Sequence, residues 1–169
     1  TQNGSIYFQI ENAMAAIGAG WAVGLDWLVI RAGVSSFVSD AQTAPGRFNL
    51  FNYRNATLIA DYGHNPDAIQ ALVSAINNIP SKKRSVVISA AGDRRDEDIR
   101  QQTRILGDAF DEVVLYQDKC QRGRADGEVL TLLREGLGNA KRTQKVSEIV
   151  GEDIAIDAAL SNLKDGELC

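Results

Sequence analysis

Short apolar segments alternate with longer amphipathic segments after residue 55, and this alternation is the feature that most restricts the fold. The apolar segments have the length of buried strands, and the segments between them carry apolar residues every three or four positions, as helices do. This order is typical of βαβ units, in which helices cover both faces of a parallel sheet and crossovers are right-handed. The sequence predicts an α/β, Rossmann-like, mostly parallel sheet, with strands at 56–60, 85–90, 112–116 and 143–146, helices at 66–79, 96–109, 127–137 and 153–163, and the opening of a further strand at 166–169.

The first 43 residues have a different character. Helical periodicity covers 9–24, which is rich in alanine and glycine, and 26–37. The small side chains of the first segment favour a helix that packs closely against another surface. A polar loop that ends at Pro45-Gly46 follows. We therefore expect a short helical unit at 1–43 and the α/β domain at 44–169.

The composition is that of an ordinary globular domain. The 169 residues are 44% hydrophobic and 24% charged with a net charge of −4, which argues against disorder and against a basic nucleic-acid surface. No apolar stretch of about 18 residues predicts a membrane span. Two cysteines argue against a disulfide scaffold and are consistent with the reducing cytoplasm. A single histidine argues against a histidine-rich metal site. No signal peptide is visible in the first residues, and a missing start would look the same. The chain does not begin with methionine, so we expect a piece of a longer protein.

Ligands of parallel sheets bind beside the carboxyl ends of the strands, so the loops after the predicted strands are the candidate sites. The loop DYGHNP begins with Asp61, whose carboxylate can accept hydrogen bonds from a ribose diol. His64 can donate to phosphate oxygens near a helix start, where free N–H groups favour an anion. Alternatively, Asn65 is a helix N-cap and His64 is a surface residue. Both interpretations remain open.

The loop AGDRRDED at 91–98 follows the second predicted strand. Asp93, Arg94 and Arg95 can hold an anion or a zwitterion. Alternatively, the loop is the solvated start of a helix, whose acidic residues complement the helix dipole, and this accounts for the same residues. The pattern alone favours the second interpretation.

The loop QRGRADGE at 121–128 follows the third predicted strand. Arg122 and Arg124 flank a glycine, and arginine side chains bind carboxylates with two parallel hydrogen bonds. An exposed basic turn is an equal alternative. The neighbouring Cys120 has no base that would make it a nucleophile.

The segment PGRFN at 45–49 lies at the expected domain boundary. Arg47 can reach a nucleotide bound between two domains, although a linker turn with a solvated arginine is the simpler interpretation. Neither G-x-x-x-x-G-K-[ST] nor a G-x-G-x-x-G after a strand occurs in the chain.

Taken together, these segments resemble the Mur ligase family, which includes folylpolyglutamate synthetases. The matching stretches are FQIENAMAA, APGRF, DYGHNPDA and GDRRDED, in the order of the family. The longer stretches GRFNLFNYRNATLIADYGHNPDAIQAL and QRGRADGEVLTLLREG resemble the Mur-like part of the members that lengthen a polymer of aspartate and arginine. The resemblance implies ATP-dependent amide bond formation, in which an amine attacks an acyl phosphate.

The resemblance also implies roles for single residues in binding ATP. Asn12 would contact the adenine, Arg47 would reach the nucleotide from the linker, Asp61 would hold the ribose, and His64 would lie beside the phosphates. The family has His-Asn where this chain has Phe8 and Gln9.

The incoming amino acid, arginine, would bind at the other two loops. Arg122 and Arg124 would take its carboxylate, and Asp93, Asp96 or Glu128 its guanidinium, with Arg94 in the same site. The acceptor would be a polymer that contains aspartate.

The resemblance further implies that 1–43 is the tail of the central ATPase domain and that 44–169 is a C-terminal domain truncated at its last strand. The phosphate loop, the Mg²⁺ ligands and a modified lysine lie upstream in the family, so we expect no catalytic residue in this chain and no turnover by it alone. The alternatives are another Mur-type ligase, such as a folylpolyglutamate synthetase or a peptidoglycan precursor ligase, a non-catalytic nucleotide- or amino-acid-binding module, and an assembly domain that docks through its Ala/Gly-rich helix. The oligomeric state is left open, with a homo-oligomer as one option.

Overall fold

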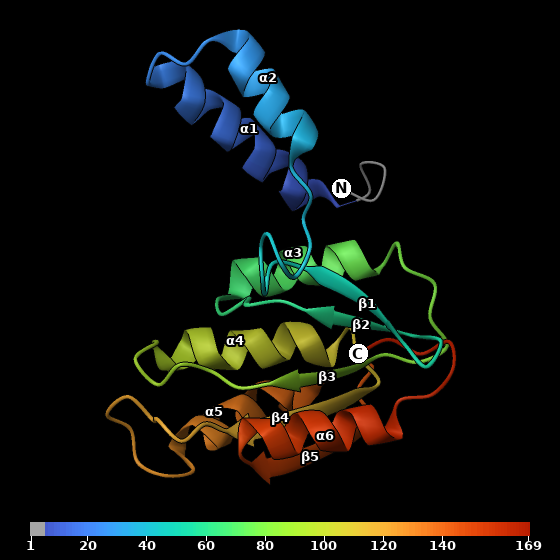
Figure 1. Ribbon diagram of the computed structural model, residues 1–169. Coiled ribbons are helices and arrows are strands. Elements are labelled where there is room, and N and C mark those ends of the chain that lie inside the picture. Colours follow the sequence, from blue (N-terminus) through green and yellow to red (C-terminus); the bar gives the residue numbers. More distant parts are fainter. Residues whose placement is uncertain (1–5) are drawn as a thin grey trace.

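The computed structural model describes residues 6–169. A helical hairpin formed by α1 (Tyr7–Ala22) and α2 (Trp27–Ser36) precedes an α/β unit that begins at β1 (Asn49–Tyr53). Figure 1 shows the hairpin projecting away from the α/β unit on a thin connection. Asp26 caps α2 by accepting a hydrogen bond from the Leu28 N–H, whereas no residue of α1 is buried.

Three parallel strands form the larger sheet. β3 (Ser85–Ile88) pairs with β4 (Glu112–Gln117), which pairs with β5 (Lys145–Val150). The predicted strands are therefore present, with the largest shift at β5. Thr143 lies outside β5, and its hydroxyl is within hydrogen-bond distance of the carbonyls of Phe110, at 2.9 Å, and Gly107, at 3.2 Å.

An antiparallel hairpin forms the second sheet, and half of it was absent from the sequence prediction. β1 pairs with β2 (Ala56–Ala60), which was predicted, across a turn at Arg54 and Asn55. Both turn residues have left-handed φ angles, 52° and 62°, the conformation that joins two strands in a tight type I′ hairpin. The mixed letters of β1, NLFNY, lack the apolar continuity of the other strands, which explains the omission.

The last three residues join the two sheets. Leu168 bridges Thr57 on one side and Arg84 on the other, both in parallel. The Ile59 N–H donates to the Cys169 carbonyl at 2.7 Å, and the Ser85 N–H donates to the Leu168 carbonyl at 2.8 Å. The strand order is therefore β1, β2, 167–169, β3, β4, β5, and only β1 is antiparallel. This arrangement confirms the predicted α/β, mostly parallel sheet.

Helices cover both faces of this sheet. The layer on one face contains α3 (Pro66–Ile76), α4 (Asp96–Gly107) and α5 (Glu128–Gly136), with the short 3₁₀ helix η2 (Leu137–Asn139), and α6 (Glu152–Asn162) lies on the other face (Figure 1). α6 returns the chain past β3, so a right-handed crossover puts it opposite the other helices. The core between the layers includes the fully buried Ile76, Ile99, Leu106, Leu115 and Leu133. No helix within residues 6–169 is long and apolar enough to cross a membrane.

A charged network closes the sheet at the end where β4 begins. Asp111 accepts two hydrogen bonds from the Arg142 guanidinium, each at 2.9 Å, and one from the Arg84 backbone N–H at 2.8 Å. Its side chain is 20% exposed. The Arg142 hydrogen bond, together with the Arg84 N–H and both positive charges, lowers the pKa of Asp111 below its ordinary value.

We expect Asp111→Asn to lower the free energy of unfolding by about 1.5–3 kcal/mol at pH 7, the usual value of hydrogen bonds to a charged group. A carboxylate with a lowered pKa stabilises the fold above its unfolded pKa of about 3.9, and this contribution disappears as pH falls through the folded pKa. The free energies of unfolding of the wild type and of Asp111→Asn, measured in urea, should therefore differ at pH 7 and converge as the pH falls. Asp165→Asn, in a pair with Lys82 that is exposed on both sides, is the control and should have little effect. A difference that stays constant with pH would contradict the assignment.

Candidate functional site

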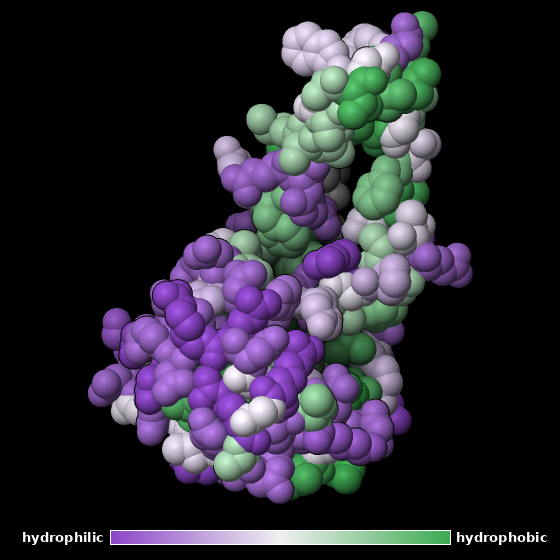
Figure 2. All heavy atoms as spheres, turned by 90° about the vertical axis from the view of Figure 1, so that its left-hand side faces the viewer, coloured by the Kyte–Doolittle hydropathy of each residue, from purple (hydrophilic) through white to green (hydrophobic). Residues whose placement is uncertain are grey.

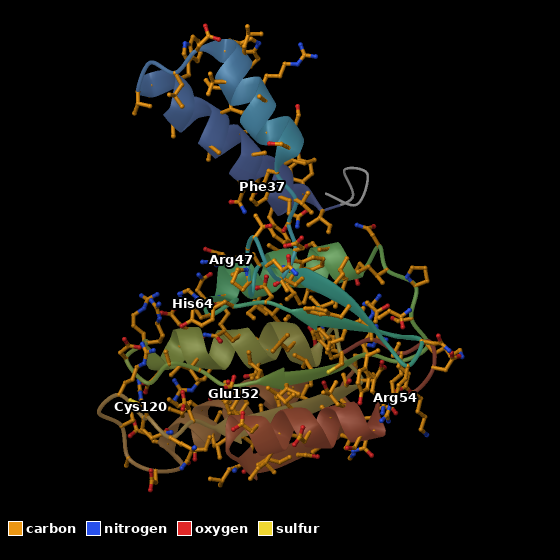
Figure 3. All side chains as sticks on the ribbon, viewed as in Figure 1. Phe37, Arg47, Arg54, His64, Cys120 and Glu152 are labelled. Atoms are coloured by element: carbon orange, nitrogen blue, oxygen red, sulfur yellow. The ribbon has the colours of Figure 1, made fainter. Side chains whose placement is uncertain are left out.

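The loops after β2, β3 and β4 lie together at the carboxyl edge of the sheet. Figure 3 places Arg47, His64 and Cys120 on this side of the molecule, whereas Arg54 in the β1–β2 turn lies at the other end. Figure 2 faces the same side and shows a mostly hydrophilic surface on the α/β unit below a more hydrophobic helical hairpin. The polar loops are thus gathered on one surface.

Two backbone contacts hold Arg47 beside Asp61. The Tyr62 N–H donates to the Gly46 carbonyl at 2.8 Å, and the Phe48 N–H donates to Asp61 Oδ2 at 2.8 Å. Phe48 is buried, and its φ of 53° turns the chain so that Arg47 stays at the surface. Within the described residues, Asp61 Oδ1 has no hydrogen-bond partner and the Arg47 guanidinium has no ion pair. Both side chains can therefore engage a ligand.

The third predicted ATP-binding residue, His64, has one ring nitrogen occupied. Its Nδ1 lies 3.0 Å from the Tyr62 carbonyl, which can only accept, so Nδ1 carries the hydrogen. Nε2 of the neutral ring is then an acceptor, and His64 donates to a phosphate through Nε2 only as an imidazolium. The neighbouring Asn65 accepts a hydrogen bond from the Ala68 N–H at 2.8 Å and caps α3, with Pro66 in the first turn. The expected N-cap is confirmed, and the role of His64 stays a prediction.

Asn12, the fourth predicted ATP-binding residue, lies on α1 and is exposed. Within residues 6–169, no hydrogen bond or ion pair joins it to Arg47, Asp61 or His64. The structure therefore brings three of these four side chains to one edge and leaves Asn12 on the helical hairpin.

The five residues predicted for the incoming amino acid form a network of two sets of contacts, one around Arg124 and one between Arg122 and Asp93. Arg124 Nη1 donates to Glu128 at 2.7 Å, and Arg124 Nη2 donates to the Arg94 carbonyl at 2.7 Å. Arg122 Nη1 lies 3.3 Å from Asp93. These contacts connect the loop after β3, the loop after β4 and the start of α5, which are separate in the sequence.

The two arginines of this network differ in how many of their guanidinium donors make hydrogen bonds. Arg124 also donates through Nε to the Gly92 carbonyl at 2.6 Å and through Nη2 to Asp96 at 2.8 Å, and its side chain is 15% exposed. The alternative of an exposed basic turn therefore does not describe Arg124. The Arg122 side chain is 49% exposed, and Asp93 is its single partner among the described residues.

The charges of the network shift the pKa of both arginines upward. The pKa of Arg124 is raised chiefly by its hydrogen bonds to Asp96 and Glu128. The pKa of Arg122 is raised chiefly by Asp93 and more weakly by Tyr62 and Cys120. Tyr62 belongs to the same loop after β2 as His64, which Figure 3 places on the side of the molecule that also carries Cys120.

Sequence reasoning overlooked Gly92, Ser89 and Gln102. A Cβ on the buried Gly92 would lie 2.0 Å from the Gln121 carbonyl oxygen, so only glycine lets the two loops touch. Buried Ser89 Oγ, at the end of β3, has no hydrogen-bond partner among the described atoms. Gln102 is fully buried on α4 and donates to the His64 carbonyl at 3.4 Å. A glycine directly after a strand was a usable signal for close approach, whereas nothing local marks a buried serine or glutamine.

One groove is lined by none of these loops. It has a volume of about 640 Å³ and lies between the hairpin and β1, lined by Gln9, 37–42 and 48–51. Gln9 Oε1 is buried there without a partner in the described part of the chain. No group of three or more His, Cys, Asp or Glu side chains within residues 6–169 is arranged to hold a metal ion.

The α/β fold is that of a domain found in a family of ligases. Residues 46–169 match the family described as Mur ligase, glutamate ligase domain, and the chain belongs to the Mur ligase family. The cyanophycin synthetase of Synechocystis sp. is 34% identical over 165 residues, which make up 98% of this chain and 19% of that protein. The ligase of Alkaliphilus metalliredigens named UDP-N-acetylmuramoyl-L-alanyl-D-glutamate--2,6-diaminopimelate ligase is 28% identical, over 95% of this chain and 31% of that protein.

Solved structures of ligases have a similar fold. The structure described as E. coli FolC in complex with DHPP and ADP superposes with a TM-score of 0.71 at 26% identity, covering 93% of this chain and 34% of that chain. The resemblance stated from the motifs is thereby confirmed, including the similarity to cyanophycin synthetases. The chain spans about a fifth of the length of the cyanophycin synthetases it matches.

Proposed function

We propose that this chain is the C-terminal part of an ATP-dependent ligase that joins arginine to an aspartate-containing polymer through an acyl phosphate. One observation carries the proposal: two polar groups with unused hydrogen-bonding capacity meet at one edge of the sheet. Arg47 and Asp61 form the first group, and Asp93 and Arg122 belong to the second. An ATP-dependent amide ligase needs adjacent sites of this kind for a nucleotide and for an amino acid.

The first group fits ATP. The free Oδ1 of Asp61 suits a ribose hydroxyl, and the unpaired Arg47 suits a phosphate, since a guanidinium binds phosphate oxygens with two parallel N–H bonds. His64 would lie beside the phosphates, and Asn12 would approach the adenine. The ADP named for the E. coli FolC structure supports this assignment. Mg²⁺ would be held by residues outside this chain.

The second group fits a zwitterionic amino acid. The carboxylate of arginine would bind Arg122, whose Nε and Nη2 are unpaired among the described residues, and Asp93 would meet a cationic group of the substrate. Arg94, whose guanidinium has no ion pair within the described chain, lies on the same loop as Asp93. Arg124 and Glu128 complete the site.

Residues 1–43 would be the tail of a central ATPase domain, and the rest of that domain would cover the hairpin. The support is the large apolar surface there: Trp21 is 74% exposed, Trp27 59% and Leu28 72%, more than isolated surface residues account for. Figure 2 shows this surface as the most hydrophobic part of the face in view. The remaining four fifths of such a protein would supply the phosphate loop. The cytoplasm is the proposed location.

We therefore expect the isolated 169-residue chain to bind ATP weakly or not at all and to hydrolyse none. Calorimetry with ATP and a phosphate-release assay measure both, with the full-length protein as the positive control. Turnover by the isolated chain would contradict the proposal that the phosphate loop lies elsewhere.

The decisive experiment is an ATP- and primer-dependent incorporation assay on the full-length protein. Labelled arginine, glutamate and diaminopimelate are offered separately, with an aspartate-containing polymer, a folate and a peptidoglycan precursor as acceptors. The proposal expects incorporation of arginine into the polymer. Glutamate on the folate, or diaminopimelate on the precursor, would assign another Mur-type ligase, and binding without any turnover would assign a non-catalytic module.

A further inference from the structure

Arg124 has almost no hydrogen-bonding capacity left for a substrate. A guanidinium has five N–H donors, and Arg124 makes four hydrogen bonds, to the Gly92 and Arg94 carbonyls and to the carboxylates of Asp96 and Glu128. A substrate carboxylate needs two parallel donors from one guanidinium. It would have to displace Asp96 or Glu128 from a side chain that is only 15% exposed.

The same four contacts tie three segments together. Gly92 and Arg94 belong to the loop after β3, Asp96 begins α4, and Glu128 begins α5. Gly92 touches the Gln121 carbonyl, and the Arg124 backbone N–H donates to that carbonyl at 3.1 Å. Arg124 therefore closes the turn that carries Arg122 and presses it against the loop that carries Asp93 and Arg94.

The exposed Arg122 contrasts with this arrangement. It holds Asp93 at 3.3–3.4 Å through Nη1, a long contact that an incoming carboxylate can replace. Its backbone φ of 48° is in the left-handed region, which costs energy for a residue with a side chain. The surrounding contacts must hold that conformation, and those of Arg124, two residues further on, are among them.

We propose that Arg124 is a positioning residue: it acts on the incoming amino acid through Arg122, by locking the two loops, and does not contact the substrate. The inference rests on the proposed function, because it assigns the amino-acid site to these loops. It separates two arginines that the sequence treats alike.

A double-mutant cycle in the full-length protein tests the inference. The apparent KM for arginine is measured at saturating ATP for the wild type, Arg122→Ala, Arg124→Ala and the double variant. Each single change should raise this KM about tenfold, the loss of one modest charged contact, and leave the KM for ATP unchanged. The double variant should lie within about twofold of the larger single effect, because residues that act as a unit are not additive.

Two independent substrate contacts would instead multiply to about a hundredfold in the double variant, and that result would overturn the inference. Arg134→Ala is the matched control: Arg134 pairs with Glu148 on the surface of α5 and β5, and its loss should leave the KM for arginine unchanged. Arg124→Lys keeps the charge and replaces Arg124→Ala in the cycle if the alanine variant unfolds.

The inference and the proposed function fail in different ways. If the wild type uses another amino acid, arginine is the wrong substrate, and the same cycle with that amino acid decides the role of Arg124. If the wild type shows no amino-acid-dependent turnover, the proposed function is wrong and the inference falls with it. If turnover is present and Arg124→Ala leaves the amino-acid KM unchanged, the inference alone is wrong.

Discussion

Replacing Asp61 with alanine in the full-length protein is expected to raise the apparent KM for ATP by roughly ten- to a hundredfold. The physical reason is the loss of a charge-assisted hydrogen bond from the ribose to Asp61 Oδ1, worth about 1.5–3 kcal/mol. Initial rates over a range of ATP concentrations at saturating amino acid measure the effect. The KM for the amino acid should change little.

Asp61 also accepts a hydrogen bond from the Phe48 N–H, so the alanine variant loosens the turn that carries Arg47. Asp61→Asn separates the two effects, since its amide oxygen can keep the Phe48 contact while the charge is lost. If the asparagine variant retains the wild-type KM and the alanine variant does not, Asp61 only supports the turn. An unchanged KM in both would remove Asp61 from the nucleotide site.

Gly92→Ala is expected to lower kcat/KM for the incoming amino acid by about a hundredfold, because a displacement of about 1 Å in a positioned site costs that much. A Cβ at residue 92 would lie 2.0 Å from the Gln121 carbonyl oxygen. The Cβ is fixed to the backbone of one loop and the carbonyl is backbone of the other, so the two loops must move apart. The movement stretches the bond from Arg124 to the Gly92 carbonyl.

Gly138→Ala is the matched control, since a Cβ there meets no atom within 4 Å, and it should leave kcat/KM unchanged. Thermal unfolding of both variants separates loss of the site from loss of the fold. Wild-type kcat/KM in Gly92→Ala would contradict the close contact between the loops.

Much of the α/β fold was predictable because its signals are local. The helix from Pro66 follows from apolar residues at helical spacing and from an N-cap at Asn65, and the structure has both. The run 112–116 predicted a strand, and the structure has β4 there, in which Val113 and Leu115 are fully buried. β1 was missed because a hairpin edge strand with polar letters has no such signal.

The chemistry of the candidate site was predictable only as a set of residue types. Loops at strand ends, rich in arginine and acid, indicated an anion- or zwitterion-binding edge, and the residues do gather there. No local pattern predicts that the donors of the Arg124 guanidinium bind groups of the same chain while the Arg122 side chain is half exposed. Both residues are arginines next to the same glycine. The difference in their hydrogen bonding comes chiefly from the residues that contact Arg124 from 28 to 32 positions away in the sequence.

The sequence by itself determined the class of fold, the edge of the sheet where the candidate residues gather and membership in the Mur ligase family, because periodicity and motifs are properties of neighbouring residues. Only the tertiary structure decided which partners meet. Leu168 lies between Thr57 and Arg84, more than eighty residues away from both, and Arg124 reaches Gly92 across 32 positions. Such pairings depend on how layers pack and how crossovers turn, and these are set by burial summed over the whole domain, which no local segment encodes.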